Sequence, residues 1–346
     1  MGRVVVVTSG KGGVGKTTST AALGAALART GQAVVVIDFD MGLRNLDLVM
    51  GAELRVVYDF VDVIQGAAKL PQALIRDKRI ETLFLLPASQ TGDKDALTED
   101  GVARVIEELR PKFDWVICDS PAGIERGATL AMRHADAAVI VANPEVSSVS
   151  DSHRIIGLLD AKTEKAEKGE RIEKHLLLTR YDAARAARGE MLTIGDVLEI
   201  LSTPLLGIIP ESEEVLRASN FGSPITIGNP SSAIGRAYVD AARRLKGEVV
   251  EMTIPSDKKG LFNKLLGRRA SQQERMKTCN TKAGAKNLAS DARRTFMSDR
   301  LSGRTAVEPA VNSQQQKMKD CNATAGEQKL TGDARRTFMR SCLKGT

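Results

Sequence analysis

Glycines and lysines at residues 10–17 have the types and spacing of a phosphate-binding loop. The segment reads GKGGVGKT and fits the pattern GxxxxGK[ST]. It follows the Val-rich run Arg3–Thr8 and opens a helical pattern over Thr17–Arg29, the strand–loop–helix context that this pattern requires. Glycines let backbone N–H groups point at bound phosphates, and the helix N-terminus adds a partial positive charge. The residues expected to bind a nucleotide are Gly10, Lys11, Gly12, Gly13, Val14, Gly15, Lys16, Thr17 and Thr18.

Three carboxylates are expected to lie near these phosphates. Asp38 and Asp40 end the apolar run VVVIDFD, and Asp119 ends the apolar run in WVICDSPAG. Lys16 is expected to bridge the β- and γ-phosphates, and the candidates for a Mg²⁺ site are Thr17, Asp38 and, in the outer shell, Asp119. Asp40 is expected to orient the attacking water, so the predicted reaction is hydrolysis of the γ-phosphate without a covalent intermediate. The alternative for Asp38 and Asp40 is a structural role as strand-end caps or turn residues.

Lys11 is a second lysine inside the same loop. It adds more positive charge than the binding of one nucleotide requires. One useful place for this charge is against the nucleotide of a neighbouring subunit, which would link nucleotide binding to dimer formation. Lys11, Lys16 and Asp40 are therefore the predicted catalytic residues.

The elements that must position these residues alternate along the chain. Short apolar runs are separated by longer helical patterns, and runs that are apolar on both faces are typical of buried parallel strands with helices on both sides. We predict an α/β fold with a doubly wound, mostly parallel sheet, whose ligands lie at the carboxyl ends of the strands. The predicted strands are Arg3–Thr8, Ala33–Asp38, Thr82–Leu86, Asp114–Asp119, Ala137–Ala142, Leu176–Thr179 and Leu205–Ile209.

Charge is distributed unevenly along the 346 residues. Residues 1–255 contain 30 basic and 35 acidic side chains, whereas residues 256–346 contain 20 basic and 8 acidic ones. A basic tail suggests an anionic partner, either a membrane surface or a nucleic acid, and a merely solvated segment is the alternative. An aromatic content of 3% argues against single-stranded nucleic acid. The start of the chain lacks the layout of a secretion signal and no apolar run is long enough to span a bilayer, so we expect the protein in the cytoplasm.

The segment Asp257–Arg269 has the pattern of a short amphipathic helix. It reads DKKGLFNKLLGRR, and its apolar residues share one helical face with lysines and arginines beside it. A narrow apolar stripe with a basic margin is typical of a helix at a membrane interface. A helix that packs back on the domain is the alternative. The predicted membrane contacts are Leu261, Phe262, Leu265 and Leu266.

Several longer motifs occur in order and together resemble the deviant Walker A ATPases of the ParA/MinD family that determine the cell-division site. The resemblance runs from Met1 to about Arg269, and DKKGLFNKLLG corresponds to the family's C-terminal membrane-targeting helix. It implies a P-loop NTPase fold, although 77 residues follow Arg269 here, whereas the targeting helix normally ends the chain. The other motifs are KGGVGKTT, IDFDMGLRNLDLVMG, VVYDFVDVIQG, LPASQT, CDSPAGIE, NPEVSSVSDS, HLLLTRY and VLRASN.

The resemblance implies further roles for single residues. Lys11 would reach across a sandwich dimer, and Asp38 with Asp40 would form the first switch. Asp119 is similar to the Walker B residue of the family. Asp151 matches a residue that relays the nucleotide state toward the membrane helix and partners, and Asn220 lies in a segment near the adenine.

The resemblance also implies a function. The protein is expected to be a Mg²⁺-dependent ATPase that forms a homodimer with ATP and binds the anionic surface of the inner membrane from its cytoplasmic face. It would position the septum by recruiting a MinC-like septation inhibitor, and a MinE-like activator would stimulate the ATP hydrolysis that releases it. Nucleic acid is not an expected partner.

The C-terminal part contains an internal duplication. Residues 271–303 and 313–345 align with 19 identities over 33 positions, and both copies contain DARRTFM. The pattern resembles the PsiF-type repeat of phosphate-starvation-inducible proteins. The second half-cystine that this repeat implies occurs only in the second copy, so Cys321 and Cys342 are the one possible pair within a repeat. Because disulfides seldom persist in the cytoplasm, we interpret the tail as a fusion or read-through product, with export of the whole chain as the weaker alternative.

The predicted organisation is an ATPase domain over residues 1–255, a membrane-targeting helix over residues 256–269 and the repeats within residues 270–346. The main alternative function is that of a ParA-like or flagellar-placement ATPase that acts on DNA or polar partners. The net acidic ATPase part and the apolar stripe argue against DNA. A carrier of a metal cluster related to the nitrogenase iron protein is a second alternative, but the ATPase part contains only Cys118, which is more simply interpreted as a core residue.

Overall fold

The computed structural model describes residues 1–90 and 96–255. The predicted membrane helix, with Leu261, Phe262, Leu265 and Leu266, and both predicted repeats lie outside the described residues. Within the described part, no helix has the length and apolar character needed to cross a bilayer. The strands are β1 (Arg3–Thr8), β2 (Val34–Asp38), β3 (Ile75–Arg76), β4 (Leu83–Leu86), β5 (Trp115–Asp119), β6 (Ala137–Ala142), β7 (Glu173–Tyr181) and β8 (Leu205–Pro210).

The strands form one eight-stranded sheet in the order β3-β4-β2-β5-β1-β6-β7-β8. All neighbouring strands run parallel except β3, which pairs antiparallel with β4 at the edge. This confirms the predicted doubly wound, mostly parallel α/β fold. The sequence pattern missed β3, because a strand of two residues has no measurable periodicity.

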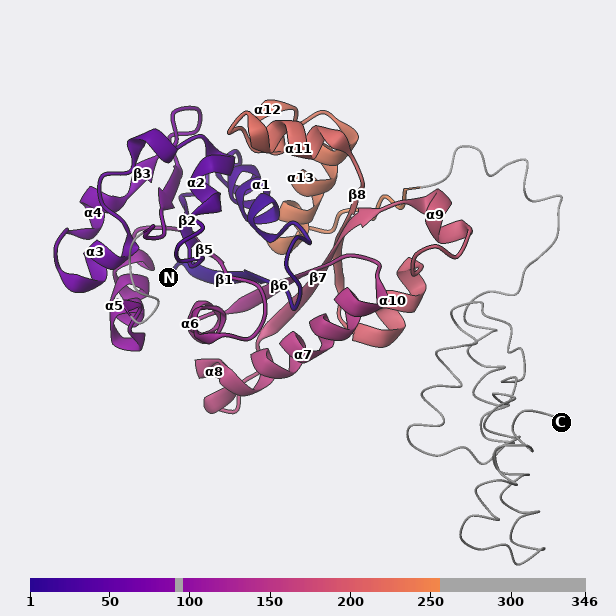
Figure 1. Cartoon of the computed structure of the whole chain (residues 1–346), viewed down its shortest axis with the longest axis horizontal. Helices are drawn as coiled ribbons and strands as arrows, with labels where there is room; N and C mark the ends of the chain where they lie inside the picture. The colour runs from indigo at the N-terminus through magenta and orange to yellow at the C-terminus, as the bar shows by residue number, and fades with distance from the viewer. Residues whose placement is uncertain (91–95, 256–346) are drawn as a thin grey trace, which may run out of the picture. The chain divides into compact units, whose positions relative to one another are not determined.

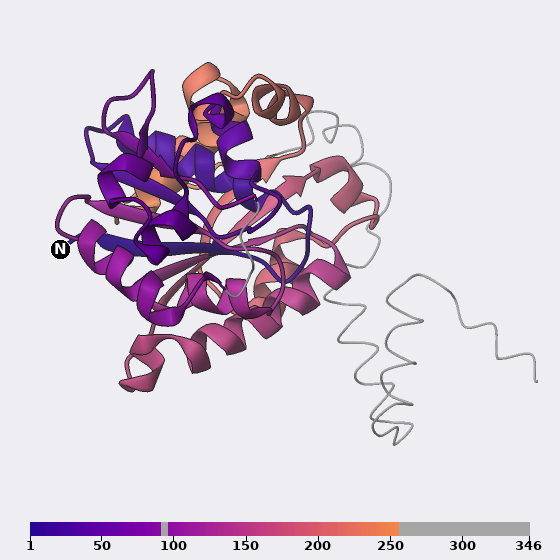
Figure 2. The same ribbon diagram turned by 60° about the vertical axis from the view of Figure 1, so that its left-hand side comes forward.

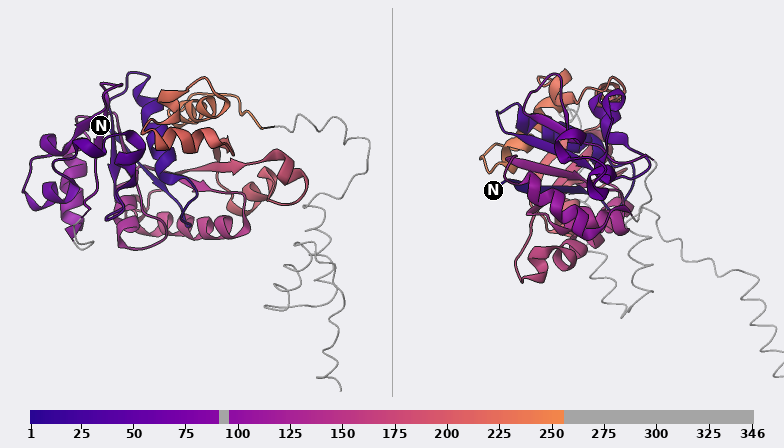
Figure 3. Two further views of the ribbon diagram at one scale, coloured as in Figure 1. Left: turned by 45° about the horizontal axis from the view of Figure 1, so that its top comes forward. Right: turned by 90° about the vertical axis from the view of Figure 1, so that its left-hand side faces the viewer.

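Helices connect successive strands, except β3 and β4, which a turn joins, and they cover both faces of the sheet (Figure 1). Figure 2 and Figure 3 show the two helical layers from other directions. The helices are α1 (Lys16–Ala28), α2 (Asn45–Met50), the 3₁₀ turn η1 (Glu53–Arg55), α3 (Phe60–Gln65), α4 (Leu70–Ala73), α5 (Glu99–Leu109), α6 (Arg126–Arg133), α7 (Val146–Lys162), α8 (Glu164–Glu167), α9 (Ala183–Ala187), α10 (Ile194–Leu201), α11 (Glu213–Asn220), α12 (Ile225–Gly228) and α13 (Ala233–Leu245).

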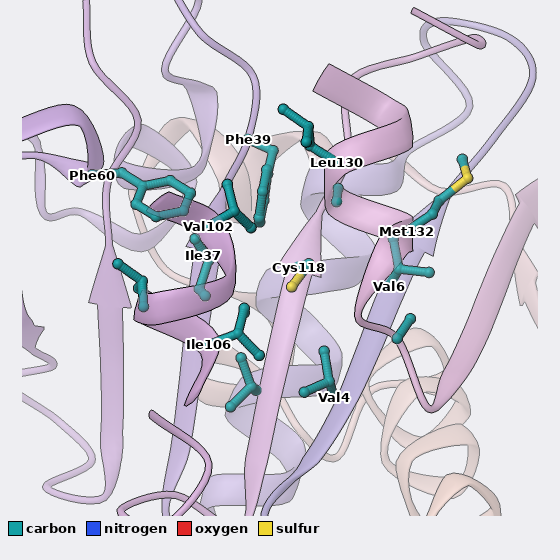
Figure 4. Packing of buried hydrophobic residues seen from close by; sticks show 14 of the residues in the cluster. Val4, Val6, Ile37, Phe39, Phe60, Val102, Ile106, Cys118, Leu130 and Met132 are labelled. Carbon is teal, nitrogen blue, oxygen red and sulfur yellow. The ribbon is translucent and has the colours of Figure 1, made fainter. Parts of the chain in front are cut away.

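Strand residues alternate between two main cores. Val4 and Val6 of β1 face the layer that contains α3, α5, α6 and α7, whereas Val5 and Val7 face α1, α2, α12 and α13. All four valines are fully buried, as expected for the central strand of a parallel sheet. The first core is drawn in Figure 4, where Cys118 lies among aliphatic and aromatic side chains. Cys118 is 1% exposed, which confirms that it is a core residue.

The register of the central strands brings the functional segments to one edge of the sheet. Val7 of β1 and Asp38 of β2 both lie opposite Asp119 of β5, which stands between these two strands. The loop after β1 and the two strand-end carboxylates therefore meet at the carboxyl ends of adjacent strands. This is the place where ligands bind in open parallel sheets.

Candidate functional site

The N-terminus of α1 is open to a ligand. At the start of helices such as α3, α5 and α10, a capping side chain accepts a hydrogen bond from a backbone N–H of the helix. The capping residues are Asp59, Thr98 and Thr193 respectively. Helix α1 begins after Gly15 without a side-chain cap, so its first N–H groups keep their capacity to bind an anion.

The glycines of the loop leave room for that anion. Gly13 and Gly15 have φ angles of 75° and 94°, in the left-handed region that side chains rarely adopt. A Cβ atom added at either position would meet no atom within 4 Å, so the space above the loop is open. The loop thus combines unbonded backbone donors with free volume, which is the arrangement that phosphates require.

Lys16 is the first residue of α1, next to Gly15, and is only 8% exposed. Burial lowers its pKa, while the nearby Asp119 and Asp40 carboxylates oppose the shift. A desolvated ammonium group gains more from an added anion than an exposed one does, because the surrounding dielectric constant is lower. The position of Lys16 therefore fits its predicted contact with phosphate oxygens.

Asp38 is completely buried at the end of β2. One of its oxygens accepts the backbone N–H of Asp40 at 2.8 Å, and the other accepts the N–H of Leu46 at 3.2 Å. Burial and then the negative charge of Asp119 raise the pKa of Asp38 well above its ordinary value. These hydrogen bonds hold the loop between β2 and α2 in place. They agree with the alternative interpretation of Asp38 as a strand-end cap or turn residue. Asp40 lies at the start of that loop, close enough to contribute to the electrostatics of Lys16 and Asp119.

Asp119 is 1% exposed and accepts hydrogen bonds from helix α1. The hydroxyl of Thr20 donates to its Oδ1 at 2.8 Å. Burial raises the pKa of Asp119 to about 6, and the hydrogen bonds from Thr17 and Thr20 together with the charge of Lys16 limit the rise. Asp119 is thus held directly beside the predicted Mg²⁺ ligand Thr17. The sequence motifs did not identify Thr20, because no loop pattern includes a residue one helical turn after Lys16.

The residues present fit Mg²⁺ held partly by a ligand. Among residues 1–90 and 96–255, no three His, Cys, Asp or Glu side chains form a group that could hold a metal ion. Mg²⁺ is usually bound by one or two protein oxygens together with phosphate oxygens and water. The hydroxyl of Thr17 and the carboxylate of Asp119 are such a partial donor set.

Lys11 has other neighbours than Lys16. Its Nζ donates to Glu145 Oε2 at 2.9 Å and to Ser147 Oγ at 3.1 Å, at the N-terminal end of α7. The side chains of Lys11 and Glu145 are 40% and 54% exposed. The two lysines of the motif therefore have different environments, and the partners of Lys11 were not predicted.

Helix α7 also contacts the loop through its backbone. A Cβ atom added at Gly10 would lie 2.4 Å from the backbone carbon of Asp151, so only glycine allows this approach. Strand β7 also contacts the loop. The buried Thr179 hydroxyl lies 2.7 Å from the carbonyl oxygen of Val14 and 2.8 Å from Asn143 Oδ1. The structure thus places the predicted relay residue Asp151 directly against the phosphate-binding loop.

A cavity of about 470 Å³ adjoins the phosphate-binding loop. It is lined by Gly15 and Thr18, by Thr179 and Arg180 at the end of β7, and by parts of α2 and α11. Arg180 has a φ of 53°, which is rare for a residue other than glycine, at a bulge between β7 and β8. Cavities of this size hold ligands larger than phosphate alone.

Asn220 does not line this cavity. It is an exposed residue at the end of α11, whereas its neighbour Ser219 is among the lining residues. A contact between Asn220 and an adenine therefore stays a prediction. The lining residue Arg180 comes directly after the predicted strand Leu176–Thr179 and lies in the motif HLLLTRY, but it was not among the predicted site residues.

Comparisons with known proteins agree in both parts of the chain. The model of the CobQ/CobB/MinD/ParA nucleotide binding domain matches residues 5–225, and the psiF repeat model matches residues 269–302 and 311–344. The septum site-determining protein MinD of Escherichia coli K12 is 58% identical over 270 residues, which cover 77% of this chain and 100% of that protein. MinD of Neisseria meningitidis serogroup B is 56% identical over 271 residues, with the same coverage of 77% and 100%.

Solved structures give the same result. The chain is similar to the MinC:MinD cell division protein complex of Aquifex aeolicus, with a TM-score of 0.64, 41% sequence identity, and coverage of 73% of this chain and 99% of that one. It is also similar to the septum site-determining protein MinD of Pyrococcus horikoshii, solved with Mg-ADP. That match has a TM-score of 0.62, 31% identity, and coverage of 71% of this chain and 96% of that one.

Proposed function

The chain belongs to the MinD family of septum site-determining proteins, and on that premise we propose that it is a Mg²⁺-dependent ATPase that positions the division septum. We also propose that ATP holds two copies together, that the dimer binds the cytoplasmic face of the inner membrane, and that hydrolysis releases it. A MinC-like inhibitor and a MinE-like activator are the proposed partners; the MinC:MinD complex of a relative supports the first.

The position of Lys16 carries the proposal of ATP hydrolysis. Lys16 is a buried residue at the uncapped N-terminus of α1, and its charge interacts with Asp119 and Asp40. A γ-phosphate seated there would receive backbone N–H groups and the charge of Lys16. Thr17 and Asp38, with Asp119 in the outer shell, would hold Mg²⁺, which neutralises negative charge on the phosphates when it is bound. Asp40 would orient the attacking water.

The cavity beside the loop would take the nucleoside. Gly15 and Thr18 line it and belong to the same turn that would hold the phosphates, so one ligand can occupy both places. Its volume of about 470 Å³ is within the usual range for small-molecule sites.

The membrane part of the proposal depends on a weak contact that is doubled in the dimer. Each of the four apolar residues Leu261, Phe262, Leu265 and Leu266 contributes roughly 1.5–3 kcal/mol if it is fully buried. Ordering of the helix and incomplete burial consume much of this free energy, so a single copy should bind marginally. Two helices on one dimer would bind with an avidity gain of about 10²–10⁴-fold.

Liposome sedimentation with ATP, ADP and no nucleotide tests this proposal. We expect the full-length chain and a chain that ends at Arg269 to sediment with anionic vesicles only with ATP. The Lys16→Ala variant should stay in the supernatant in all three conditions. Equal sedimentation in every nucleotide state would overturn the switch, and loss of binding by the shortened chain would show that the repeats are required.

A further inference from the structure

The lining of the cavity beside the loop includes residues from distant parts of the sequence. Val49 of α2 lines it, and so do Val215, Leu216 and Ser219 of α11. These helices lie side by side (Figure 1). The packing of α2 against α11 therefore helps to shape this part of the cavity.

The two helices touch through glycines at their C-terminal ends. Gly51 follows α2 with a φ of 64°, and Gly222 lies just beyond α11 with a φ of 57°. A Cβ atom added at Gly222 would be 2.6 Å from the Cα atom of Gly51, and one added at Gly51 would be 2.6 Å from the carbonyl oxygen of Gly222. The backbones thus approach more closely than any side chain would permit.

Arg79, in the turn between β3 and β4, fastens this junction. Its NH2 group donates to the carbonyl oxygen of Met50 at 2.9 Å, and its NH1 group donates to the carbonyl oxygen of Gly222 at 3.0 Å. One guanidinium group therefore bonds the C-terminal carbonyl of α2 and the chain just after α11. Carbonyl groups at these helix ends have unused acceptor capacity and favour a cation.

Asp77 holds the guanidinium group in that orientation. Its oxygens accept from the Arg79 NH2 group at 2.7 Å and from Nε at 3.2 Å. The carboxylate also accepts the backbone N–H groups of Arg79 and Ile80, and its side chain is 1% exposed. Burial raises the pKa of Asp77, but the hydrogen bonds from Arg79 outweigh this effect and the net shift is downward. The hydrogen-bonded carboxylate of Asp77 thus fixes the orientation of the Arg79 guanidinium group.

We propose that Arg79 is a positioning residue that sets the width of the nucleoside cavity by holding α2 against the end of α11. Arg79 is not among the residues that line the cavity, so it acts through the two helices. The inference rests on the proposed function, because it assigns the cavity to the nucleoside of ATP. Within the described part of the chain, no hydrogen bond joins residues 10–17 to the carbonyl oxygen of Met50 or of Gly222.

This arrangement predicts a selective defect in the Arg79→Lys variant. Lysine keeps the charge beside Asp77 but lacks the planar fork, so it cannot bond both carbonyls and the carboxylate together. We expect the Kd of ATP to rise about tenfold. The Kd of inorganic tripolyphosphate, which can use only the loop, should stay within about twofold, and kcat at saturating ATP should be unchanged.

Two further variants separate positioning from general stability. In Gly222→Ala, the added Cβ atom would push the chain after α11 away from Gly51 at the end of α2. This variant should also weaken the binding of ATP more than the binding of tripolyphosphate. Arg55→Lys is the matched control. Arg55 also donates to a backbone carbonyl oxygen, that of Arg76, at 2.7 Å. Within the described part of the chain, it makes no hydrogen bond to α11 or to Gly222. Melting temperatures without nucleotide report any loss of stability.

Each result has a defined meaning. If the wild-type chain binds no ATP, the proposed function fails. The role of Arg79 is overturned if the wild type binds ATP and Arg79→Lys raises the Kd of ATP and the Kd of tripolyphosphate by the same factor. It is also overturned if Arg79→Lys changes neither Kd. An equal ATP-selective defect in Arg55→Lys would also overturn it.

Discussion

The two sides of the phosphate-binding loop hold their charges in different ways. On the inner side, Lys16 is 8% exposed and Asp119 is 1% exposed, with a hydroxyl of α1 bonded to the carboxylate. On the outer side, the side chains of Lys11 and Glu145 keep 40% and 54% of their exposure. Buried, bonded charges are preorganised for chemistry, whereas an exposed ion pair contributes little and can exchange partners. The loop thus combines one buried cation, Lys16, with one exposed cation, Lys11.

The largest expected effect comes from removing the inner cation. Lys16→Ala should weaken ATP binding at least about thirtyfold, because loss of one partner from a buried charge pair costs about 2–5 kcal/mol. Calorimetric titration of the purified chain with Mg-ATP measures this change. The reason is the desolvated position of Lys16, where a phosphate gains most from its charge.

Lys11→Ala is the matched control in the same loop. Its side chain is exposed and bonded to α7, so ATP binding by a monomer at low protein concentration should change by less than about fivefold. Equal losses in the two variants would show that both lysines contact the nucleotide of their own subunit, and the contrast between the two sides would then be wrong.

An intermediate effect is expected from Thr20, which supports the inner side. Thr20→Val removes the hydroxyl that bonds Asp119 and should lower the free energy of unfolding by about 1–3 kcal/mol. Thr20→Ser keeps the donor and should recover most of the loss. Urea denaturation at pH 8 without nucleotide measures both variants.

The same pair of variants has an expected pH dependence. The Thr20 hydroxyl stabilises the charged form of Asp119, whose pKa burial raises to about 6. Below that pH the folded chain carries a protonated Asp119, and the bond to the carboxylate no longer contributes. The difference between Thr20→Val and wild type should therefore be largest above pH 7 and shrink as the pH falls through about 6. A difference that is constant from pH 5 to pH 8 would show that only packing is lost.

The inner side was largely predictable from the sequence, and the outer side was not. A loop motif and two apolar runs that end in aspartate identified Lys16, Asp38 and Asp119, because parallel strands bring their carboxyl ends to one edge. Contacts formed only by tertiary packing left no local signal. Glu145 meets Lys11 across 134 positions, and Arg79 meets Gly222 across 143. Thr20 lies in an Ala-rich helix where a hydroxyl has no distinctive spacing.

The smallest effect is expected on the outer side, from Glu145→Gln. The exposed pair with Lys11 contributes less than about 1 kcal/mol, so the urea midpoint should hardly change. Ser147 can still accept a hydrogen bond from Lys11, which keeps the local geometry. Releasing the charge of Lys11 from Glu145 should make it more available to a second subunit. We therefore expect ATP-dependent dimers at a protein concentration up to about fivefold lower than for wild type.

Analytical ultracentrifugation with a non-hydrolysable ATP analogue measures this dimer directly. Glu173→Gln is a suitable control, because the exposed Glu173 side chain forms an ion pair with Arg3 and a hydrogen bond with His175 at the opposite, amino end of the sheet. Weaker dimers in Glu145→Gln but not in Glu173→Gln would mean that Glu145 stabilises the dimer instead of restraining Lys11. Because the exposed pair with Lys11 contributes less than about 1 kcal/mol, the expected effect of Glu145→Gln on dimer formation is small.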